Sequence, residues 1–181
     1  ALGSSALTNN TTGTLNTAVG QSALFSNTTA SNNTAVGYNA LNLNTTGTYN
    51  VAVGGDALEK NTASNNTAVG YQALEENTTG EYNTAVGTYA ITASTTAQRN
   101  TAVGYGAGDA ITTGSYNTGV GMGAMGGLTT GDYNTAVGSG SLSTLTTGDH
   151  NVAFGRNAGD GIVEGDYNIF LGYQACLLYT S

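Results

Sequence analysis

The segment Asn83-Thr84-Ala85-Val86-Gly87 decides the fold, because its closing glycine returns at a fixed interval along the whole chain. This glycine column occupies positions 3, 20, 37, 54, 70, 87, 104, 121, 138, 155 and 172. From Gly20 to Gly172 every interval is 17 residues, except for one of 16 between Gly54 and Gly70. A short period sustained over the full length is typical of stacked-repeat architectures. The chain is therefore predicted to form one continuous, rod-like array.

Aligning the repeats on this glycine gives further columns. Asn occupies the position four residues earlier, including Asn83 and Asn100. Asn suits a corner because it tolerates left-handed backbone, and stacked amides can form ladders. Thr or Val follows the Asn, and a larger apolar residue precedes the glycine. We expect these two columns to point inward, with Val86 between Val69 and Val103, and the intervening Ala to occupy the opposite face.

A second apolar motif, Ala-Leu or a close variant, follows the glycine in most repeats, as at residues 23–24 and 40–41. Each repeat therefore contains two short strand-like pieces, separated by the glycine and by a Thr-Thr-Gly corner. Helical repeats need about 33 or more residues, and Gly, Asn and Thr disfavour helix. The predicted fold is all-β: a parallel β-solenoid, or β-roll, of about eleven 17-residue coils over residues 1–175.

Two irregularities refine this prediction. The short repeat has lost one residue at 61–63, which indicates an external corner where deletions are tolerated. The seventh position after the glycine changes from Asn or Ser to Ile111, Leu128, Leu145 and Ile162 in later coils. Gly108 and Gly159 replace the Leu of Ala-Leu in the coils that contain Ile111 and Ile162. We infer that the core is repacked there, with the missing Leu replaced from the neighbouring column.

Composition limits the classes of partner. The 181 residues have a net charge of −8, with only Lys60, Arg99 and Arg156 as cations. Nucleic acid and anionic membranes are therefore poor partners, because both require clustered Lys and Arg. No apolar run approaches a membrane span. The repeat stops after Ala175, and residues 176–181 match a translated sequencing adapter. We expect that tail to be non-native and the chain to be a metagenomic fragment of a longer protein.

The segments 50–54, 151–155 and 168–172, together with Asn-Thr-Ala-Val-Gly elsewhere, resemble the YadA-like head repeats of trimeric autotransporter adhesins. The chain is also similar to repeat arrays in phage tail fibres and in bacterial surface proteins that end in an endosialidase-type intramolecular chaperone. The resemblance covers residues 3–175. It implies a left-handed parallel β-roll, three chains side by side, an extracellular location and an adhesive role.

Acidic residues share the column that follows the Thr-Thr-Gly corner: Glu81, Asp132, Asp149 and Asp166. Carboxylates at a spacing of about 4.8 Å could hold Ca²⁺, which binds six to eight oxygens. The alternative is a solvated corner with no metal. We favour the solvated corner, because no calcium-binding nonapeptide motif accompanies these residues.

Aromatic residues form two columns that could contact a sugar or a protein, or pack between coils. One column contains Tyr38, Tyr71, Tyr105 and Tyr173; the other contains Tyr49, Tyr82, Tyr116, Tyr133, His150 and Tyr167. We favour a structural role for both columns, since they follow the repeat. The single His lacks partners for catalysis or metal binding. No nucleophile-and-base set can be assembled, so neither enzymatic activity nor a cofactor is expected.

Together with these patterns, the resemblance implies a structural and adhesive segment of a trimeric cell-surface adhesin or phage tail fibre that presents a receptor-binding surface. The expected partners are two further copies of the chain and a host surface protein or glycan. We expect the small Ala side chains to form an exposed stripe on the outer face of the strands, along which the three copies pack. The alternative is an ice-binding solenoid with a hydroxyl grid made by Thr pairs at 11–12, 28–29, 45–46, 78–79, 95–96, 112–113, 129–130 and 146–147.

Overall fold

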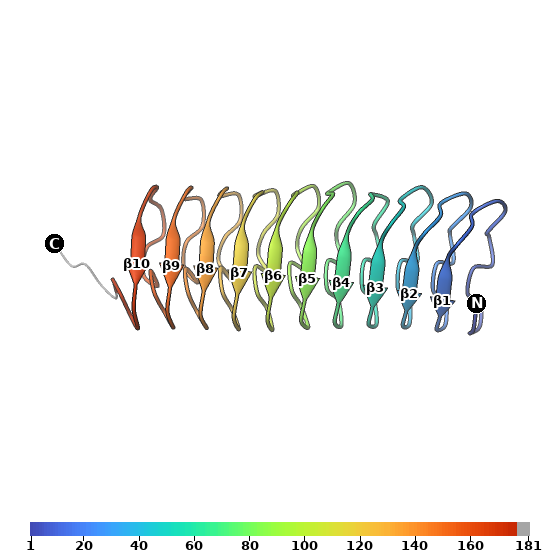
Figure 1. The fold of residues 1–181 in the computed structure, drawn as a ribbon, viewed down its shortest axis with the longest axis horizontal. Coiled ribbons are helices and arrows are strands. Elements are labelled where there is room, and N and C mark those ends of the chain that lie inside the picture. The colour runs from blue at the N-terminus through green and yellow to red at the C-terminus, as the bar shows by residue number, and fades with distance from the viewer. Residues whose placement is uncertain (177–181) are drawn as a thin grey trace.

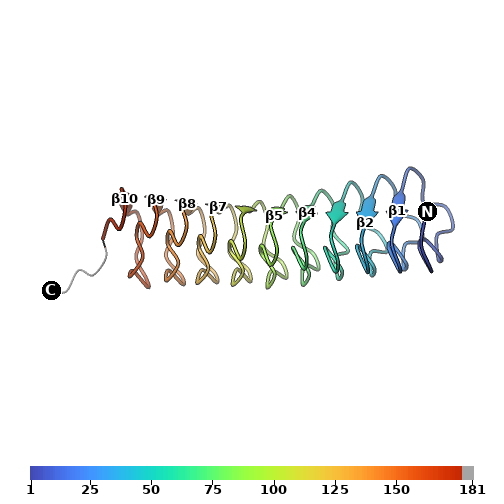
Figure 2. The same ribbon diagram turned by 90° about the horizontal axis from the view of Figure 1, so that it is seen from below.

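The computed structural model describes residues 1–176, which wind into a solenoid with one ten-stranded parallel sheet (Figure 1). The strands are β1 (Thr17–Val19), β2 (Thr34–Val36), β3 (Val51–Val53), β4 (Thr67–Val69), β5 (Thr84–Val86), β6 (Thr101–Val103), β7 (Thr118–Val120), β8 (Thr135–Val137), β9 (Val152–Phe154) and β10 (Ile169–Leu171). They follow chain order across the sheet. Figure 2 shows that this sheet occupies one side of a thin rod and that the connecting segments occupy the other.

The predicted all-β parallel solenoid is confirmed, but the number of coils is smaller than eleven. Ten strands define nine complete turns between β1 and β10. The glycine column has an eleventh member, Gly3, which only two residues precede. This short segment forms a single bridge, Leu2 to Val19, instead of a further strand.

Each strand residue pairs with its counterpart one repeat later. In β5 and β6 the partners are Thr84 with Thr101, Ala85 with Ala102 and Val86 with Val103. The register is kept across the 16-residue interval, where β3 pairs with β4 through Ala52 and Ala68. The missing residue thus lies outside the sheet, at the corner that contains the exposed Thr62. The prediction of an external corner is confirmed.

Two separate constraints require glycine at the end of each strand motif. Gly87 has a φ of +140°, in a region that is almost restricted to glycine. A Cβ atom built on Gly87 would also lie 2.3 Å from the carbonyl oxygen of Gly104 in the next coil. Backbone conformation and close stacking of consecutive coils together explain why the column contains no other residue.

The strands face the opposite way from our expectation. Ala85 and Ala102 are fully buried, whereas Val86 and Val103 are 36% and 38% exposed. The prediction that Val86 and the Thr column point inward is therefore wrong. Each coil is so thin that the strand lies close to the segment after the glycine, and Ala leaves room for residues such as Leu74 from that segment. The alanines are interior, so they do not form the surface stripe that we expected to cover a trimer contact.

The Ala-Leu segments are buried turns, not second strands. Left-handed backbone alternates along them, with φ of 52° at both Asn39 and Leu41. Hydrogen bonds still connect consecutive coils, since the Leu41 N–H donates to the Ala57 carbonyl over 3.1 Å. Alternating backbone conformation therefore replaces strand geometry, while the apolar side chains still complete the core.

The Asn column forms a buried ladder. The side-chain oxygen of Asn83 accepts the N–H of Asn100 over 3.0 Å, and its amide nitrogen donates to the Ala97 carbonyl over 2.8 Å. These bonds satisfy the amide inside the rod. The left-handed residue at this corner is the preceding one, for example Tyr82 with φ of 61°, and not the Asn itself.

We inferred that Ile111 and Ile162 replace the Leu that is missing at Gly108 and Gly159. This is confirmed at Gly108 but not at Gly159. A Cβ atom on Gly108 would lie 2.8 Å from Cδ1 of Ile111, so Ile111 fills the space of the missing Leu. At Gly159 the nearest side chains are instead Leu142 and Phe170, at 2.6 and 2.7 Å. Phe170, which takes the place of the strand alanine, therefore fills that coil, and Ile162 is only partly buried.

Candidate functional site

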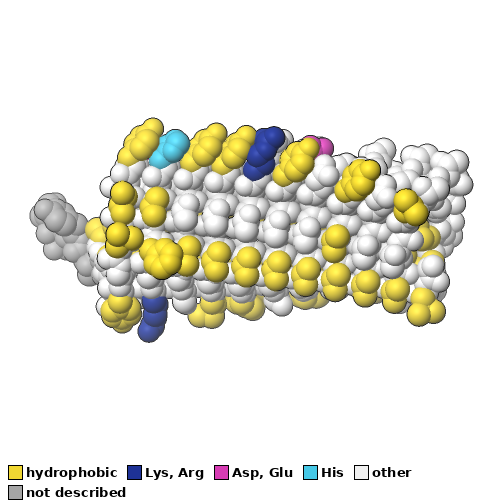
Figure 3. Space-filling model, viewed as in Figure 1, with side chains coloured by type: hydrophobic (Ala, Val, Ile, Leu, Met, Phe, Trp, Pro, Cys, Tyr) yellow, Lys and Arg dark blue, Asp and Glu magenta, His cyan; other side chains and the backbone are white. Residues whose placement is uncertain are grey.

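The outward residues of the ten strands form one regular array, which we call the sheet face. It consists of the first and third residue of every strand, mostly Thr and Val. Figure 3 shows the third-position column as a continuous apolar row along the rod. Consecutive members are about 4.8 Å apart, as in any parallel sheet. The sheet face is therefore a long surface whose chemistry repeats with every coil.

The two columns of the sheet face offer different groups to a partner. No hydrogen bond is formed within residues 1–176 by the hydroxyls of the strand threonines, such as Thr84 and Thr101. Valines lie beside them in the third-position column, and Val86, Val103 and Val120 are 36%, 38% and 37% exposed. Towards the C-terminal end the array becomes wholly apolar, where Ile169 and Leu171 are 71% and 70% exposed.

One aromatic column borders the sheet face as a stacked ladder along one edge (Figure 3). Its ring pairs Tyr116–Tyr133, Tyr133–His150 and His150–Tyr167 have centroids 4.7, 4.9 and 4.8 Å apart and lie within 12° of parallel. Because these faces are covered by neighbouring rings, mainly ring edges remain for a ligand. The ladder is thus a structural stack, with Tyr167 at its end and the 62% exposed Tyr49 outside it.

Arg99 extends this ladder, although the sequence did not identify it as a member. Its guanidinium lies 5.3 Å from the ring centroids of both Tyr82 and Tyr116, and it donates to the Tyr116 hydroxyl over 2.8 Å. A cation over a ring face is attracted by the ring quadrupole. A search for aromatic residues alone misses this position, because Arg takes the place of a ring.

The second aromatic column follows the closing glycine and borders the other edge of the sheet face. Tyr89, one position outside this column, connects two of its members. Its ring centroid lies 5.7 Å from that of Tyr71 and 5.9 Å from that of Tyr105, both edge to face. Tyr38 is 53% exposed and Tyr105 is 59% exposed. The two aromatic columns found in the sequence therefore flank the same surface.

The acidic column caps the backbone of the preceding coil. Asp132 accepts the N–H of Ser115 over 2.6 Å, Asp149 that of Asp132 over 2.7 Å, and Asp166 that of Asp149 over 2.8 Å. Ser115 does the same for Gln98. Serine and aspartate at this position therefore accept the same kind of hydrogen bond, and each of the three carboxylates has a backbone partner within the chain. Within residues 1–176 no group of three or more His, Cys, Asp and Glu side chains is placed to hold a metal ion.

The Thr-Thr corners also use hydroxyls within the fold. The Thr78 and Thr129 hydroxyls donate to the carbonyls of Thr95 and Thr146, each over 2.9 Å. The second residue of a pair, such as Thr79, is exposed on the outside of the corner. The corner is therefore a poorer hydroxyl grid than the sheet face.

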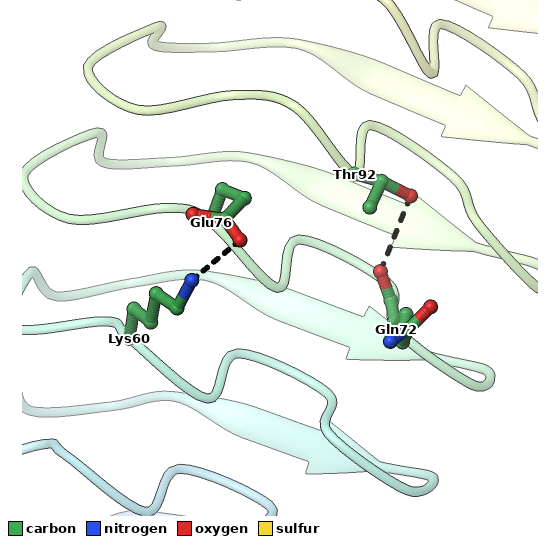
Figure 4. Close-up of polar contacts among 4 residues, drawn as sticks. All are labelled: Lys60, Gln72, Glu76 and Thr92. Carbon is green, nitrogen blue, oxygen red and sulfur yellow. Dashed lines mark hydrogen bonds and ion pairs between the residues drawn. The ribbon is translucent and has the colours of Figure 1, made fainter.

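One ion pair connects two neighbouring coils in the turns that follow the closing glycines (Figure 4). Lys60 contacts Glu76 across neighbouring coils, and Thr92 donates to the Gln72 carbonyl over 3.3 Å. Burial, followed by neighbouring carboxylates, raises the pKa of Glu59 and Glu75. The ion pair is largely solvated, and such pairs contribute little stability.

The described residues contain no helix that is long and apolar enough to cross a membrane. The non-native tail proposed for 176–181 falls, apart from the exposed Cys176, outside the described residues. No protein-family model, curated protein or solved structure matches this chain.

Proposed function

We propose that the chain is a structural and adhesive segment of a trimeric extracellular fibre, either a bacterial cell-surface adhesin or a phage tail fibre. In this proposal the sheet face packs against the same face of two further copies. The outer surface of the fibre then meets a host protein or glycan. The role is one of binding and spacing, without catalysis.

The observation that carries this proposal is the uninterrupted apolar column of the sheet face. Large apolar surfaces on a soluble rod mark interaction sites. This one runs through all ten strands, and in β9 and β10 both outward residues are apolar. The resemblance to YadA-like head repeats supports the same arrangement. A threefold contact would cover the column along the full length of the rod.

Sedimentation equilibrium of the chain tests this assembly. We expect a homotrimer, and we expect Val103→Glu combined with Val120→Glu to give monomers, because uncompensated charges would be buried between copies. The matched control is Thr79→Glu combined with Thr96→Glu on the exposed corner, which should remain trimeric. A monomeric parent chain, or a trimer that tolerates both pairs equally, would contradict the proposal.

A second function, ice binding, is favoured by the unbonded threonine hydroxyls of the sheet face. They alternate with methyl groups on a regular array, and apolar surface restricts the orientation of neighbouring water. The hydroxyl grid would then be the strand column with Thr84 and Thr101, not the Thr-Thr corners. A monomer that produces thermal hysteresis, lost in the Val103→Glu and Val120→Glu variant but kept in the corner variant, would select this function over the fibre.

A further inference from the structure

A groove of about 530 Å³ lies beyond the second aromatic column, across the four coils that begin at Gly104, Gly121, Gly138 and Gly155. Its lining includes Tyr105, Asp109, Met122, Ser143, Arg156 and Asn157. The volume falls in the range of small-molecule sites. The groove belongs to the surface of a single chain and lies on the far side of the closing glycines from the sheet face, so it does not depend on the proposed trimer.

The groove has an open floor because three consecutive coils have glycine at a position where other coils have a side chain. Two positions after the closing glycine, other coils carry residues such as Asn39, Gln72 and Tyr89, whereas these three carry Gly106, Gly123 and Gly140. All of these positions are left-handed, with φ of 55° at Gln72 and 62° at Gly123. The backbone therefore accepts a side chain in this column.

Local crowding does not require these glycines either, at least in the first two coils. A Cβ atom on Gly123 would meet nothing within 4 Å, and one on Gly106 would meet only Asp109, at 3.7 Å. Only at Gly140 would a Cβ atom crowd a neighbour, the Asn157 amide oxygen at 2.5 Å. The open floor is thus a local departure from the repeat, not a requirement of the solenoid.

The ends of the groove carry opposite charges. Arg156 is exposed, lies 5.8 Å from the centroid of the Tyr173 ring, and has no carboxylate within ion-pair distance among residues 1–176. Asp109 lies three coils away, which corresponds to about 14 Å at the spacing of a parallel stack. A ligand with one anionic end is therefore oriented, with its charge at Arg156 and its neutral end at Asp109.

Between these ends the groove offers apolar surface and polar side chains, but no unpaired strand edge. Met122 and Tyr105 are 61% and 59% exposed, and Asn157 supplies an amide. The Ser143 hydroxyl donates to the Asp160 carboxylate over 2.8 Å, so it can offer a ligand only an acceptor. The N–H groups of Gly123 and Gly140 are already bonded to the preceding coil, each over 2.9 Å. A peptide that binds by adding a strand has no partner here. Saccharides, with many hydroxyls and apolar ring faces, match the available groups better.

We propose that this groove binds a short saccharide that bears a carboxylate, with the carboxylate on Arg156 and sugar hydroxyls on Asp109 and Asn157. Arginine is suited to this contact because its planar fork matches a carboxylate. The net charge of −8 repels acidic ligands from the whole chain, so the preference for a carboxylate depends on the contact with Arg156 itself. The glycine floor lets the sugar rings lie close to the backbone.

Calorimetric titration tests this site with sialyllactose and trigalacturonate as acidic probes, and with lactose and galactotriose as their neutral counterparts. We expect saturable binding of at least one acidic probe, at least tenfold tighter than its neutral counterpart. Arg156→Gln should abolish that preference. Gly123→Gln, which places the residue found at Gln72 on the groove floor, should weaken binding at least tenfold.

The matched control is Gln72→Gly, in the same column but outside the groove, which should bind as the parent chain does. Circular dichroism checks that each variant is folded. Three results would each overturn the proposal: no saturable binding of either acidic probe, binding unchanged by both Gly123→Gln and Arg156→Gln, or equally tight binding of a triglutamate peptide.

Discussion

At the scale of single residues, the closing glycine controls how closely the coils stack. Gly87 combines a φ of +140° with a Cβ position only 2.3 Å from the Gly104 carbonyl oxygen. A methyl group there would both strain the backbone and force two coils apart. The glycines of the groove floor are different, because Gly123 has open space around its Cβ position.

Gly87→Ala is therefore expected to lower the free energy of unfolding by about 2–5 kcal/mol, from strain and overpacking together. Gly123→Ala should lower it by only about 1–2 kcal/mol, the strain of a left-handed alanine, because nothing lies within 4 Å of its Cβ position. Urea denaturation followed by circular dichroism measures both changes. Similar losses for the two variants would show that stacking does not determine the glycine column.

The sequence was sufficient to find these residues but not their causes. The glycine period and the Asn column are visible without coordinates, and so is the exchange between Gly108 and Ile111. The direction of the strands is not visible, because Thr, Ala and Val are each compatible with either face. The useful signal was side-chain size: the middle position is Ala or Gly in nine of ten strands, as expected where a facing segment restricts volume.

At the scale of the strand, an added charge is expected to destabilise the fold far more on the inward face than on the outward face. Ala85→Asp would place an unpaired carboxylate in the core and should destabilise the fold by several kcal/mol. Val86→Asp adds the same group one residue later on the outward face, and the isolated chain should lose less than about 1 kcal/mol. Thermal unfolding of a monomeric preparation compares them. A larger loss for Val86→Asp would restore the inward orientation first expected for that column.

A search of the sequence columns for aromatic residues does not find every side chain in the two aromatic columns that border the sheet face. Arg99 belongs to the aromatic ladder by position and by its contacts with Tyr82 and Tyr116. Tyr89 contacts Tyr71 and Tyr105, two members of the second aromatic column, from the adjacent position in its coil. Both contacts depend on the distance between side chains in neighbouring coils. The groove likewise depends on which side chains are missing from three consecutive coils, and the sequence does not show that these turn positions share one open surface.

At the scale of the whole molecule, the rod is a one-dimensional stack in which every strand pairs only with its neighbours. Stability in such arrays is close to a sum of coil and interface terms. Removal of one complete coil should therefore leave a shorter rod with all columns aligned. Deletion of Thr84–Asn100, a full repeat of 17 residues, joins Asn83 to Thr101 and preserves the order Asn-Thr-Ala-Val-Gly.

We expect this 17-residue deletion to fold, with an unchanged circular dichroism signal per residue and a modestly lower melting temperature. Deletion of Thr84–Thr101 removes one residue more and joins Asn83 to Ala102. The Asn and Gly columns then no longer align in the same coil, and a one-residue slip also exchanges the inward and outward faces. That variant should lose cooperative unfolding at the junction. Equal stability of the two deletions would mean that the repeat period is not what holds the rod in register.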